Sequence, residues 1–408
     1  MRVAAHALAA LGSLLVSASW SHVEAQGPYH VGARYEAFSN PTNSGSPQLV
    51  SSVYYPATSD GYQAPFVQRA GGHPVLVFLH GYGALGTYYP ELAFDWARAG
   101  YVVVLQNTAQ WNPALQIKDG AALHPALVKE NSAKGSFYQG MLDTQRMVIG
   151  GHSVGGANAV HILANNPGYR AGIAWAPFAG ANGKYTHPSG PKVAVPFAVI
   201  GGLGDIITPW NTDARSVYDN LNTKTLKFLY TFNGNGDHST VISWLSGKQP
   251  QALEVFSRSM LVARGLFDHV LYEDPGSLDD AIGLTGRADK HFQLIETSVE
   301  SPRYIKRGVD KLGKTALLQL VAPEGYAIHM LSLARVKIPT PAGTLFLDPA
   351  SIFTLQVTLQ TSAGIAVYPH PVPKDIRMKG HKFPMQALLF SNKKGLELSN
   401  SLNLAVPK

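Results

Sequence analysis

The sequence of 408 residues predicts an α/β protein whose doubly wound, mostly parallel sheet is followed by a smaller all-β, sandwich-like domain. Up to about residue 300, apolar runs of strand length alternate with amphipathic helical stretches, the pattern of parallel strands covered by crossover helices. Beyond that point, short alternating runs are separated by turn residues, which is typical of a β-sandwich. We therefore expect an α/β domain over residues 26–300 and a β-rich C-terminal domain over residues 301–408.

The α/β domain has a β-like run at residues 48–55 and then an uninterrupted apolar run, Pro74 to Leu79, that favours a buried strand. A helical stretch follows, in which apolar residues recur on one face before Gly100 ends it. The same alternation continues along the chain. Expected strands lie at residues 74–79, 101–105, 146–149, 171–175, 195–200 and 226–232. Expected helices lie at residues 89–99, 136–142, 157–165 and 250–267.

The C-terminal domain shows no helical periodicity and no internal repeat. Its short alternating runs lie between segments rich in proline, asparagine and glycine, which favour turns. The expected strands lie at residues 317–321, 328–336, 343–347, 351–359, 365–367, 386–390 and 396–398.

Composition narrows the classes of function. Charged residues make up 14% of the chain, the formal net charge is +7, and there is no cysteine. Disulfides, thiol catalysis and cysteine-based zinc sites are therefore excluded. No basic run interleaved with aromatic residues stands out, so we expect no nucleic-acid partner, and the positive charge indicates solubility or attraction to anionic surfaces. No His-Glu-x-x-His motif or calcium-loop pattern occurs, so we expect no metal and no cofactor.

The N-terminus has the features of a secretory signal peptide over residues 1–25. Met1-Arg2 supplies a positive start, an apolar stretch follows, and Val23-Glu24-Ala25 fits a small-x-small cleavage site. The apolar stretch is too short for a stable membrane span. We therefore expect a secreted or periplasmic protein, with a frayed N-terminal helix of a cytosolic protein as the alternative.

The segment Gly151-His152-Ser153-Val154-Gly155-Gly156 directly follows an expected strand and precedes an expected helix. A Gly-x-Ser-x-Gly core in that context predicts a sharp turn that lifts the Ser153 hydroxyl out of the sheet as a nucleophile. The pattern alone occurs by chance, and a glycine-rich turn with a solvent-facing serine is the alternative.

A serine nucleophile needs a histidine to take its proton and a carboxylate to orient that histidine. Asp205 and His238 follow expected strands in the order Ser, Asp, His, where a doubly wound sheet gathers its site. The rival residues are Asp213, inside an expected helix, Asp237, adjacent to His238, and His269, which comes late in the chain. The sequence therefore predicts the catalytic triad Ser153, Asp205 and His238.

A negative charge that develops on a substrate carbonyl needs preorganised hydrogen-bond donors. We expect the N–H groups of Val154, at the start of a helix, and of Tyr82, between two glycines after the strand that ends at Leu79. The side chains of Tyr82, Trp175 and Phe178 are candidate walls for an apolar acyl or aromatic group. Core packing is the alternative for each of the three.

Over about residues 27–270 the chain resembles the α/β-hydrolases, and within them the bacterial cutinase-like polyester hydrolases and the dienelactone-hydrolase-like esterases. The resemblance rests on several short segments. They are Gly27-Pro28-Tyr29, Val31-Gly32, His80-Gly81-Tyr82, Gly100 to Val104, Gly151 to Gly156, Asn165-Asn166-Pro167, Gly204-Asp205 to Pro209, and Gly236 to Ser239.

The resemblance implies the same triad and oxyanion positions, and it adds His152 and Phe178 as walls of the substrate site. The chain departs from the branch at three points. Val154 stands where methionine is usual, Phe178 stands where tryptophan is usual, and the C-terminal disulfide is absent. These departures bear on polyester activity and leave ester hydrolysis intact.

We therefore expect a secreted serine carboxylesterase, cutinase-like or lipase-like, that acts on small-molecule, lipid or polymer esters through an acyl-enzyme on Ser153. The alternatives are a non-catalytic binding protein on a hydrolase scaffold and a serine peptidase. The C-terminal domain is expected either to contact a surface or polymer or to be purely structural.

Overall fold

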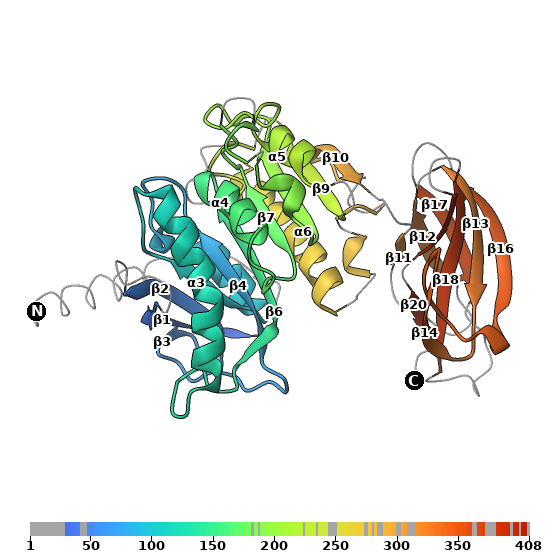
Figure 1. Cartoon of the computed structure of the whole chain (residues 1–408), viewed down its shortest axis with the longest axis horizontal. Coiled ribbons are helices and arrows are strands. Elements are labelled where there is room, and N and C mark those ends of the chain that lie inside the picture. The colour runs from blue at the N-terminus through green and yellow to red at the C-terminus, as the bar shows by residue number, and fades with distance from the viewer. Residues whose placement is uncertain are drawn as a thin grey trace, which may run out of the picture. The chain divides into compact units, whose positions relative to one another are not determined.

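The computed structural model of the chain divides into two compact units (Figure 1). One holds residues up to 222 together with 231–260, and the other holds residues 223–230 together with those from 261 onward. The structure describes residues 29–40, 47–180, 183–186, 188–222, 225–233, 236–243, 251–272, 276–279, 281–283, 289–298, 303–307, 315–322, 324–360, 365–371, 381–391, 395–399 and 401–405. The expected signal peptide lies outside these residues, and the domain boundary near residue 300 stays a prediction.

A mixed, mostly parallel ten-stranded sheet has the order β10-β9-β8-β7-β6-β4-β5-β2-β1-β3. The central strands β5, β4, β6, β7 and β8 pair in parallel, whereas β2 pairs antiparallel with β5 and with β1. The predicted α/β class with a mostly parallel sheet is confirmed. The strands are β1 (His30–Ser39), β2 (Gln48–Ala57), β3 (Gly61–Tyr62), β4 (His73–Leu79), β5 (Val102–Gln106), β6 (Leu142–His152), β7 (Gly172–Trp175), β8 (Phe197–Gly202), β9 (Lys227–Phe232) and β10 (Phe292–Ser298).

Helices connect these strands, and α4 packs on β6 and β7 and beside α3. The α-helices are α2 (Pro90–Arg98), α3 (Pro113–Ser132), α4 (Val154–Leu163), α5 (Ala214–Asn220) and α6 (Ala252–Tyr272). Short 3₁₀ helices are η1 (Gly86–Tyr88), η3 (Gly190–Lys192), η4 (Gly276–Leu278) and η5 (Pro349–Ser351). Within the described ranges, no helix is long and apolar enough to cross a membrane.

The helix expected at residues 136–142 is wrong. The helix before β6 is α3, which Asn112 caps by accepting the Leu115 N–H at 3.0 Å and which contains Pro125 in its interior. Residues 137–141 form turns instead, and Gly135 and Gly140, with φ of 81° and 70°, adopt backbone conformations that a helix does not use. The Phe137 and Tyr138 rings pack with each other at 5.2 Å and with Phe66.

The core of the first unit lies against the central strands. Every residue of β4 and β5 is buried, as expected for strands covered on both faces. The largest buried side chains here are Trp96, from α2, and Trp175, from β7. The Trp96 indole N–H donates to the Met260 sulfur at 3.3 Å, which joins α6 to α2, and the Trp175 indole N–H donates to the Ser259 hydroxyl at 2.9 Å, which joins α6 to the sheet.

The C-terminal strands form three antiparallel sheets, β11-β12-β17, β16-β13-β18-β19 with β20 beside β18, and β14-β15. The run expected at 328–336 divides between β13 and β14. The strands are β11 (Arg303–Arg307), β12 (Thr315–Val321), β13 (Gly325–Leu331), β14 (Arg335–Thr340), β15 (Gly343–Leu347), β16 (Phe353–Gln360), β17 (Ile365–Pro371), β18 (Lys382–Ser391), β19 (Gly395–Leu398) and β20 (Leu402–Ala405).

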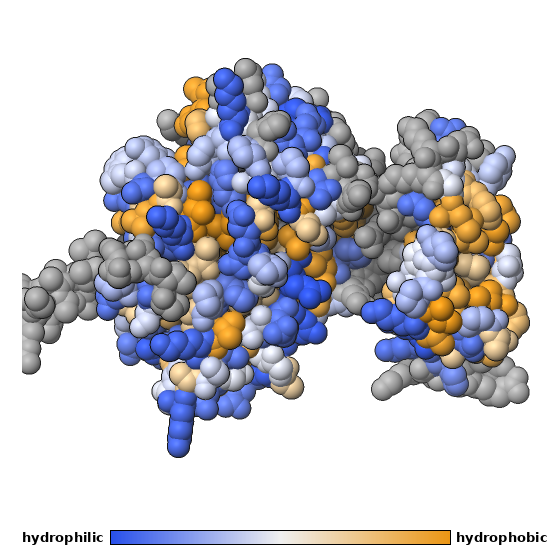
Figure 2. Space-filling view, in the orientation of Figure 1, coloured by the Kyte–Doolittle hydropathy of each residue, from blue (hydrophilic) through white to orange (hydrophobic). Residues whose placement is uncertain are grey.

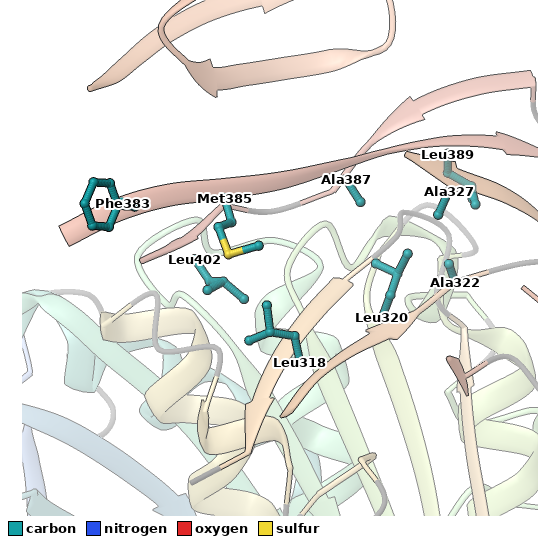
Figure 3. Packing of buried hydrophobic residues seen from close by; sticks show 9 residues of the cluster. All are labelled: Leu318, Leu320, Ala322, Ala327, Phe383, Met385, Ala387, Leu389 and Leu402. Carbon is teal, nitrogen blue, oxygen red and sulfur yellow. The ribbon is translucent and has the colours of Figure 1, made fainter. Parts of the chain in front are cut away.

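Two of these sheets share a buried core (Figure 3). Leu318 and Leu320 of β12 point toward Met385 and Ala387 of β18, and Leu402 of β20 lies with them. Because these side chains come from two separate sheets, the C-terminal strands pack in two layers around one hydrophobic core.

Candidate active site

Ser153 occupies the turn between β6 and α4 in a strained backbone conformation. Its φ is 55° and its ψ is −123°, a combination that costs free energy for any residue other than glycine. The neighbouring glycines leave no room for side chains. A Cβ on Gly155 would lie 2.2 Å from the Leu79 carbonyl oxygen, and one on Gly151 would lie 2.4 Å from Gly155. The sequence motif therefore folds as the sharp strand–turn–helix unit that it predicts.

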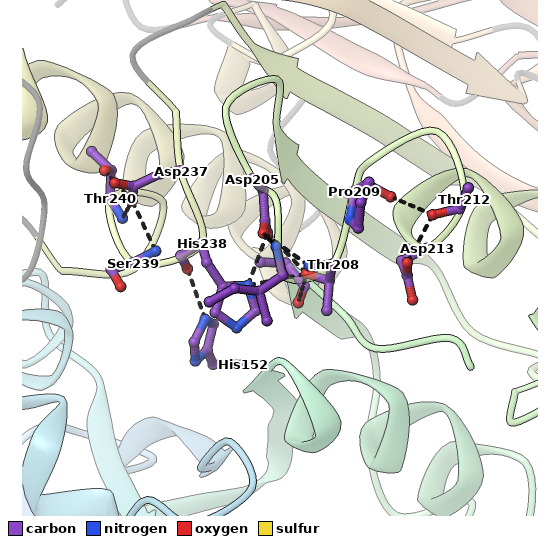
Figure 4. A network of polar contacts seen from close by, with 12 residues as sticks. His152, Asp205, Thr208, Pro209, Thr212, Asp213, Asp237, His238, Ser239 and Thr240 are labelled. Atoms are coloured by element: carbon purple, nitrogen blue, oxygen red, sulfur yellow. Dashed lines mark hydrogen bonds and ion pairs between the residues drawn. The ribbon is translucent and has the colours of Figure 1, made fainter. Parts of the chain in front are cut away.

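Asp205 and His238 meet at the carboxyl ends of β8 and β9 (Figure 4). His238 Nδ1 lies 2.8 Å from Asp205 Oδ2, and the Asp205 side chain is completely buried. Its other oxygen, Oδ1, accepts the N–H groups of Ile207 and Thr208, each at 2.9 Å. The Thr208 hydroxyl lies 2.9 Å from Oδ2 and 3.0 Å from His238 Nδ1.

The pKa of Asp205 reflects two opposing effects. Burial alone would raise it, but the hydrogen bond and charge of His238, together with the bonds from Thr208, lower it below its ordinary value. The carboxylate is therefore ionised at neutral pH and accepts a hydrogen bond from Nδ1–H. This bond fixes the tautomer and orientation of the His238 ring.

The loops that carry Asp205 and His238 touch through their backbones. A Cβ on Gly202 would lie 2.2 Å from the Gly236 carbonyl oxygen, so only glycine fits at the end of β8. The Gly204 N–H donates to the same oxygen at 2.7 Å, and the Leu203 N–H donates to the Phe232 carbonyl at 2.9 Å. Backbone contacts thus bring the acid and the histidine together.

His152, the residue before Ser153, contacts His238. The His152 Nε2 atom lies 2.8 Å from the His238 carbonyl oxygen, and the two imidazole rings are 4.5 Å apart between centroids. Among the described residues, the Ser153 hydroxyl makes no hydrogen bond to His238. The structure therefore brings Asp205 and His238 together, and the contact between nucleophile and base stays a prediction.

The two expected oxyanion donors lie on either side of Ser153. Val154 is the first residue of α4, so its N–H has no partner within the helix. Tyr82 follows Gly81, where a Cβ would lie 3.3 Å from Ser153 Cβ. The loop after β4 therefore passes next to the serine, and the donor roles of Tyr82 and Val154 stay predictions.

The expected wall residues differ in their exposure. Tyr82 and Phe178 are exposed, and the Phe178 N–H donates to the Ser153 carbonyl at 3.0 Å. His152 is almost fully buried. Trp175 has an exposed fraction of 0% and binds Ser259 with its indole N–H, so its placement supports core packing and not a wall of the site.

Trp111 is an aromatic residue at the site that the sequence analysis missed. Its side chain is 63% exposed and meets the Tyr82 ring edge to face, with 5.3 Å between centroids. Among the hydrogen bonds that join the loops after β4 and β5, one runs from Gly83 N–H to the Gln110 carbonyl at 2.9 Å and one from the Gln110 side chain to the Gly83 carbonyl at 2.8 Å. A Cβ on Gly83 would lie 2.6 Å from the Trp111 ring, so this glycine makes room for the indole.

The loops that follow the parallel strands carry other exposed apolar side chains. Besides Tyr82, Trp111 and Phe178, these are Tyr88 after β4 and Leu203, Ile206 and Ile207 after β8. In the part of the chain that the structure describes, no group of three His, Cys, Asp or Glu residues is arranged to hold a metal ion. The loops that carry the polar groups of the site therefore also carry exposed apolar side chains.

Several known proteins are similar to this chain in sequence. A family model described as PET hydrolase-like matches residues 18–247. The chain is 26% identical to cutinase cut1 of Thermobifida fusca over 248 residues, and this match covers 55% of this chain and 70% of that protein. It is 27% identical over 204 residues to a bis(hydroxyethyl) terephthalate hydrolase of Streptomyces coelicolor, covering 47% of this chain and 60% of that protein. Cutinase 2 of Thermobifida cellulosilytica is 26% identical over 184 residues, covering 45% and 63%.

Proposed function

The chain belongs to the PET hydrolase-like family, and from that premise we propose that it hydrolyses carboxylic esters through an acyl-enzyme formed on Ser153. The observation that carries this proposal is the contact of 2.8 Å between His238 Nδ1 and the buried carboxylate of Asp205. Because Nδ1 of His238 carries the proton that it donates to Asp205, the Nε2 atom is the one that can take a proton from the serine.

In the proposed reaction, His238 takes the proton of the Ser153 hydroxyl while Oγ attacks the ester carbonyl. The N–H groups of Tyr82 and Val154 bind the oxyanion of the tetrahedral intermediate. His238 then gives its proton to the departing alcohol, which leaves the acyl group on Ser153. Water attacks the acyl-enzyme with His238 again as the base, the acid is released, and the serine is restored.

Asp205 has an electrostatic role in this sequence. The imidazolium that forms on His238 faces an ionised carboxylate that is shielded from water, so their attraction is stronger than it would be in solvent. The backbone N–H groups of Ile207 and Thr208 hold that carboxylate in place before reaction begins. Preorganisation of this kind removes the need to reorient groups as charge develops.

We propose that the substrate is an apolar ester of a polymer or lipid. The exposed side chains of Tyr82, Trp111 and Phe178, with Ile206 and Ile207, support this class because they present apolar surface on the loops that follow the strands of the site. A substrate that covers these side chains would release ordered water from them. The printed name of one relative, a bis(hydroxyethyl) terephthalate hydrolase, supports an aromatic polyester as the first polymer to test.

We also propose that the first unit adopts the α/β-hydrolase fold, that residues 1–25 direct secretion, and that the C-terminal domain contacts the polymer. The last proposal is supported by an apolar row on the outer face of the β16-β13-β18-β19 sheet. Tyr326 pairs with Phe390 and Phe390 with Leu396, and all three side chains are exposed. On the face drawn in Figure 2, apolar side chains gather over the second unit. A flat apolar row suits an apolar solid better than a soluble ester.

The test combines a fluorophosphonate probe with a panel of esters that ranges from p-nitrophenyl acetate to bis(hydroxyethyl) terephthalate and polyester film. We expect labelling of the wild type at Ser153, and loss of both labelling and hydrolysis in Ser153→Ala. An unlabelled wild type would favour a binding protein on a hydrolase scaffold. Cleavage of peptides in preference to esters would favour a serine peptidase, and an active Ser153→Ala variant would rule out the acyl-enzyme.

A further inference from the structure

Tyr89 lies outside the triad and the proposed oxyanion donors, at the junction between η1 and α2, and its side chain is buried. We infer that Tyr89 is a positioning residue, whose hydroxyl ties the loop of the oxyanion donor to the loop of the catalytic histidine. The inference rests on the proposed function, because it assigns Tyr89 a task in that reaction.

The Tyr89 hydroxyl has one partner on each side. The Gly81 N–H donates to the hydroxyl oxygen at 3.0 Å, and His152 Nδ1 lies 3.1 Å from the same oxygen. The Phe78 ring, 4.8 Å away between centroids, packs against the phenol from β4. The hydroxyl is therefore held between the segment before Tyr82 and the residue before Ser153.

The directions of these hydrogen bonds follow from the partners. His152 Nε2 lies 2.8 Å from the His238 carbonyl oxygen, which only accepts, so Nε2 carries the proton. Burial, aided by the charge of His238, lowers the pKa of His152 to about 3, so its ring is neutral and Nδ1 is an acceptor. Burial raises the pKa of Tyr89 to about 12, so the phenol keeps the proton that it donates to Nδ1.

The result is a continuous chain of hydrogen bonds from Gly81 N–H to the Tyr89 hydroxyl, to His152 and to the His238 carbonyl. One end fixes the peptide that precedes Tyr82, the proposed oxyanion donor. The other end fixes the backbone of His238, whose side chain Asp205 orients. A Cβ on Gly81 would lie within 3.3 Å of both Ser153 Cβ and the Tyr89 hydroxyl, so this hydroxyl sits at the same corner of the site as the nucleophile.

Loss of the hydroxyl would therefore leave both loops less well fixed during reaction, while the surfaces that bind substrate stay as they are. Misplacement of reacting groups by fractions of an ångström lowers the rate of chemistry more than it lowers binding. For Tyr89→Phe we expect kcat on a soluble ester to fall about tenfold or more, with KM within about twofold of the wild type.

The matched control is Tyr55→Phe. Tyr55, on strand β2, is also buried, and its hydroxyl donates to the Ala64 carbonyl at 2.9 Å, outside this chain of hydrogen bonds. We expect this variant to lose stability and keep kcat. Rates are expressed per site titrated with an organophosphonate, so that a misfolded fraction of either variant is not counted. A Tyr89→Phe variant with wild-type kcat per titrated site would overturn the inference.

A double-mutant cycle tests the route through His152. In a His152→Phe background the chain of hydrogen bonds from Tyr89 to the His238 carbonyl is already broken. Tyr89→Phe should therefore lower kcat by a smaller factor in that background than in the wild type. An equal factor in both backgrounds would overturn the link to the His238 loop. Failure of the proposed function looks different, because the wild type itself would then neither react with the probe nor hydrolyse esters.

Discussion

The Nδ1 atom of His238 lies 2.8 Å from Oδ2 of Asp205, although 33 residues separate the two in the chain. No part of the Asp205 side chain is exposed, while a small part of the His238 side chain is. The Asp205 carboxylate, which holds the charge, is therefore shielded from water, whereas the His238 ring is accessible and can transfer a proton.

The first prediction concerns the choice of carboxylate. Asp205→Asn keeps the shape of the side chain but removes the negative charge that fixes the His238 tautomer, and we expect kcat to fall by about 10³- to 10⁴-fold. Asp237→Asn is the matched control, because Asp237 Oδ1 binds its own loop: it accepts the Ser239 and Thr240 N–H groups, at 2.9 and 2.7 Å, and the Thr240 hydroxyl. Steady-state kinetics on p-nitrophenyl acetate compares the two. Equal losses in both variants would contradict the assignment of the acid.

The second prediction concerns Trp111 as a wall of the substrate site. Trp111→Ala removes the exposed ring that packs on Tyr82, so we expect kcat/KM for bis(hydroxyethyl) terephthalate to fall roughly 2- to 10-fold, the value of one aromatic contact. For p-nitrophenyl acetate, which is too small to reach both rings, we expect little change. Tyr62→Ala, which removes an exposed ring on β3, serves as the control. The same loss on both esters would mean that Trp111 acts on the oxyanion loop and not on the substrate.

The third prediction concerns the glycine that seats the turn on β4. Gly155→Ala places a methyl group 2.2 Å from the Leu79 carbonyl oxygen, so the turn must move. We expect a loss of about 1–3 kcal/mol in the free energy of unfolding and a large loss of kcat. Gly135→Ala meets nothing within 4 Å but has a φ of +81°, so it should cost about 1–2 kcal/mol and leave kcat unchanged. Urea denaturation and kinetics give both quantities, and a fully active Gly155→Ala protein would refute the close packing.

The fourth prediction concerns acid stability. The pKa of His152 is lowered to about 3 by burial and by the charge of His238, whereas in the unfolded chain it is about 6.5. Between those pH values the unfolded state binds more protons than the folded state. The contribution of His152 to the free energy of unfolding is therefore complete above about pH 6.5 and decreases as the pH drops. The expected slope from this residue is about 1.4 kcal/mol per pH unit. Asp205, whose pKa is lowered by His238 despite burial, loses its contribution in the same direction.

The His152→Phe variant lacks the titrating imidazole of residue 152. The free energy of unfolding of this variant should therefore fall less steeply between pH 6.5 and 4.5 than that of the wild type. Urea denaturation at several pH values measures the slope. His329→Gln, in the C-terminal sheet, is a useful comparison because burial lowers the pKa of His329 to about 4. Parallel curves for wild type and His152→Phe would show that His152 is not buried in its neutral form.

The fifth prediction concerns the apolar row on the C-terminal sheet. Tyr326→Ser combined with Phe390→Ser interrupts the row at its two paired aromatic residues, so we expect weaker retention on polyester film. Hydrolysis of a soluble ester should be unchanged, because neither residue belongs to the proposed site. Sedimentation of the film with bound protein measures retention. Unchanged retention would leave the domain with a structural role.

The meeting of Asp205 and His238 could be predicted because each follows a strand whose apolar run is visible in the sequence. The carboxyl ends of neighbouring strands lie at one edge of the sheet, so spacing along the chain was enough for this pair, while the role of Ser153 stays a prediction. The direction of a side chain was not predictable in the same way. Trp175 ends a strand beside the site, yet it points into the core, where Ser259 of a distant helix accepts its N–H.

Contacts between loops were also out of reach. Trp111 is placed by Gly83 on another loop, and no local pattern connects the two residues. Tyr89 looked like the first residue of an amphipathic helix, and its role depends on partners from β4 and β6. Helix α3 was missed because Pro125 and a glycine interrupt its pattern, although the Asn112 cap and the following proline were readable.

The contact between Gly202 and Gly236 has a consequence for how this site can change over time. A Cβ at residue 202 would lie 2.2 Å from the Gly236 carbonyl oxygen, so position 202 cannot take a larger residue while the two loops stay together. A descendant of this chain that acquires a side chain there must first spread the loops and then restore the meeting of acid and base by other means. The constraint on position 202 therefore comes from the meeting of the two loops and is independent of any contact with substrate.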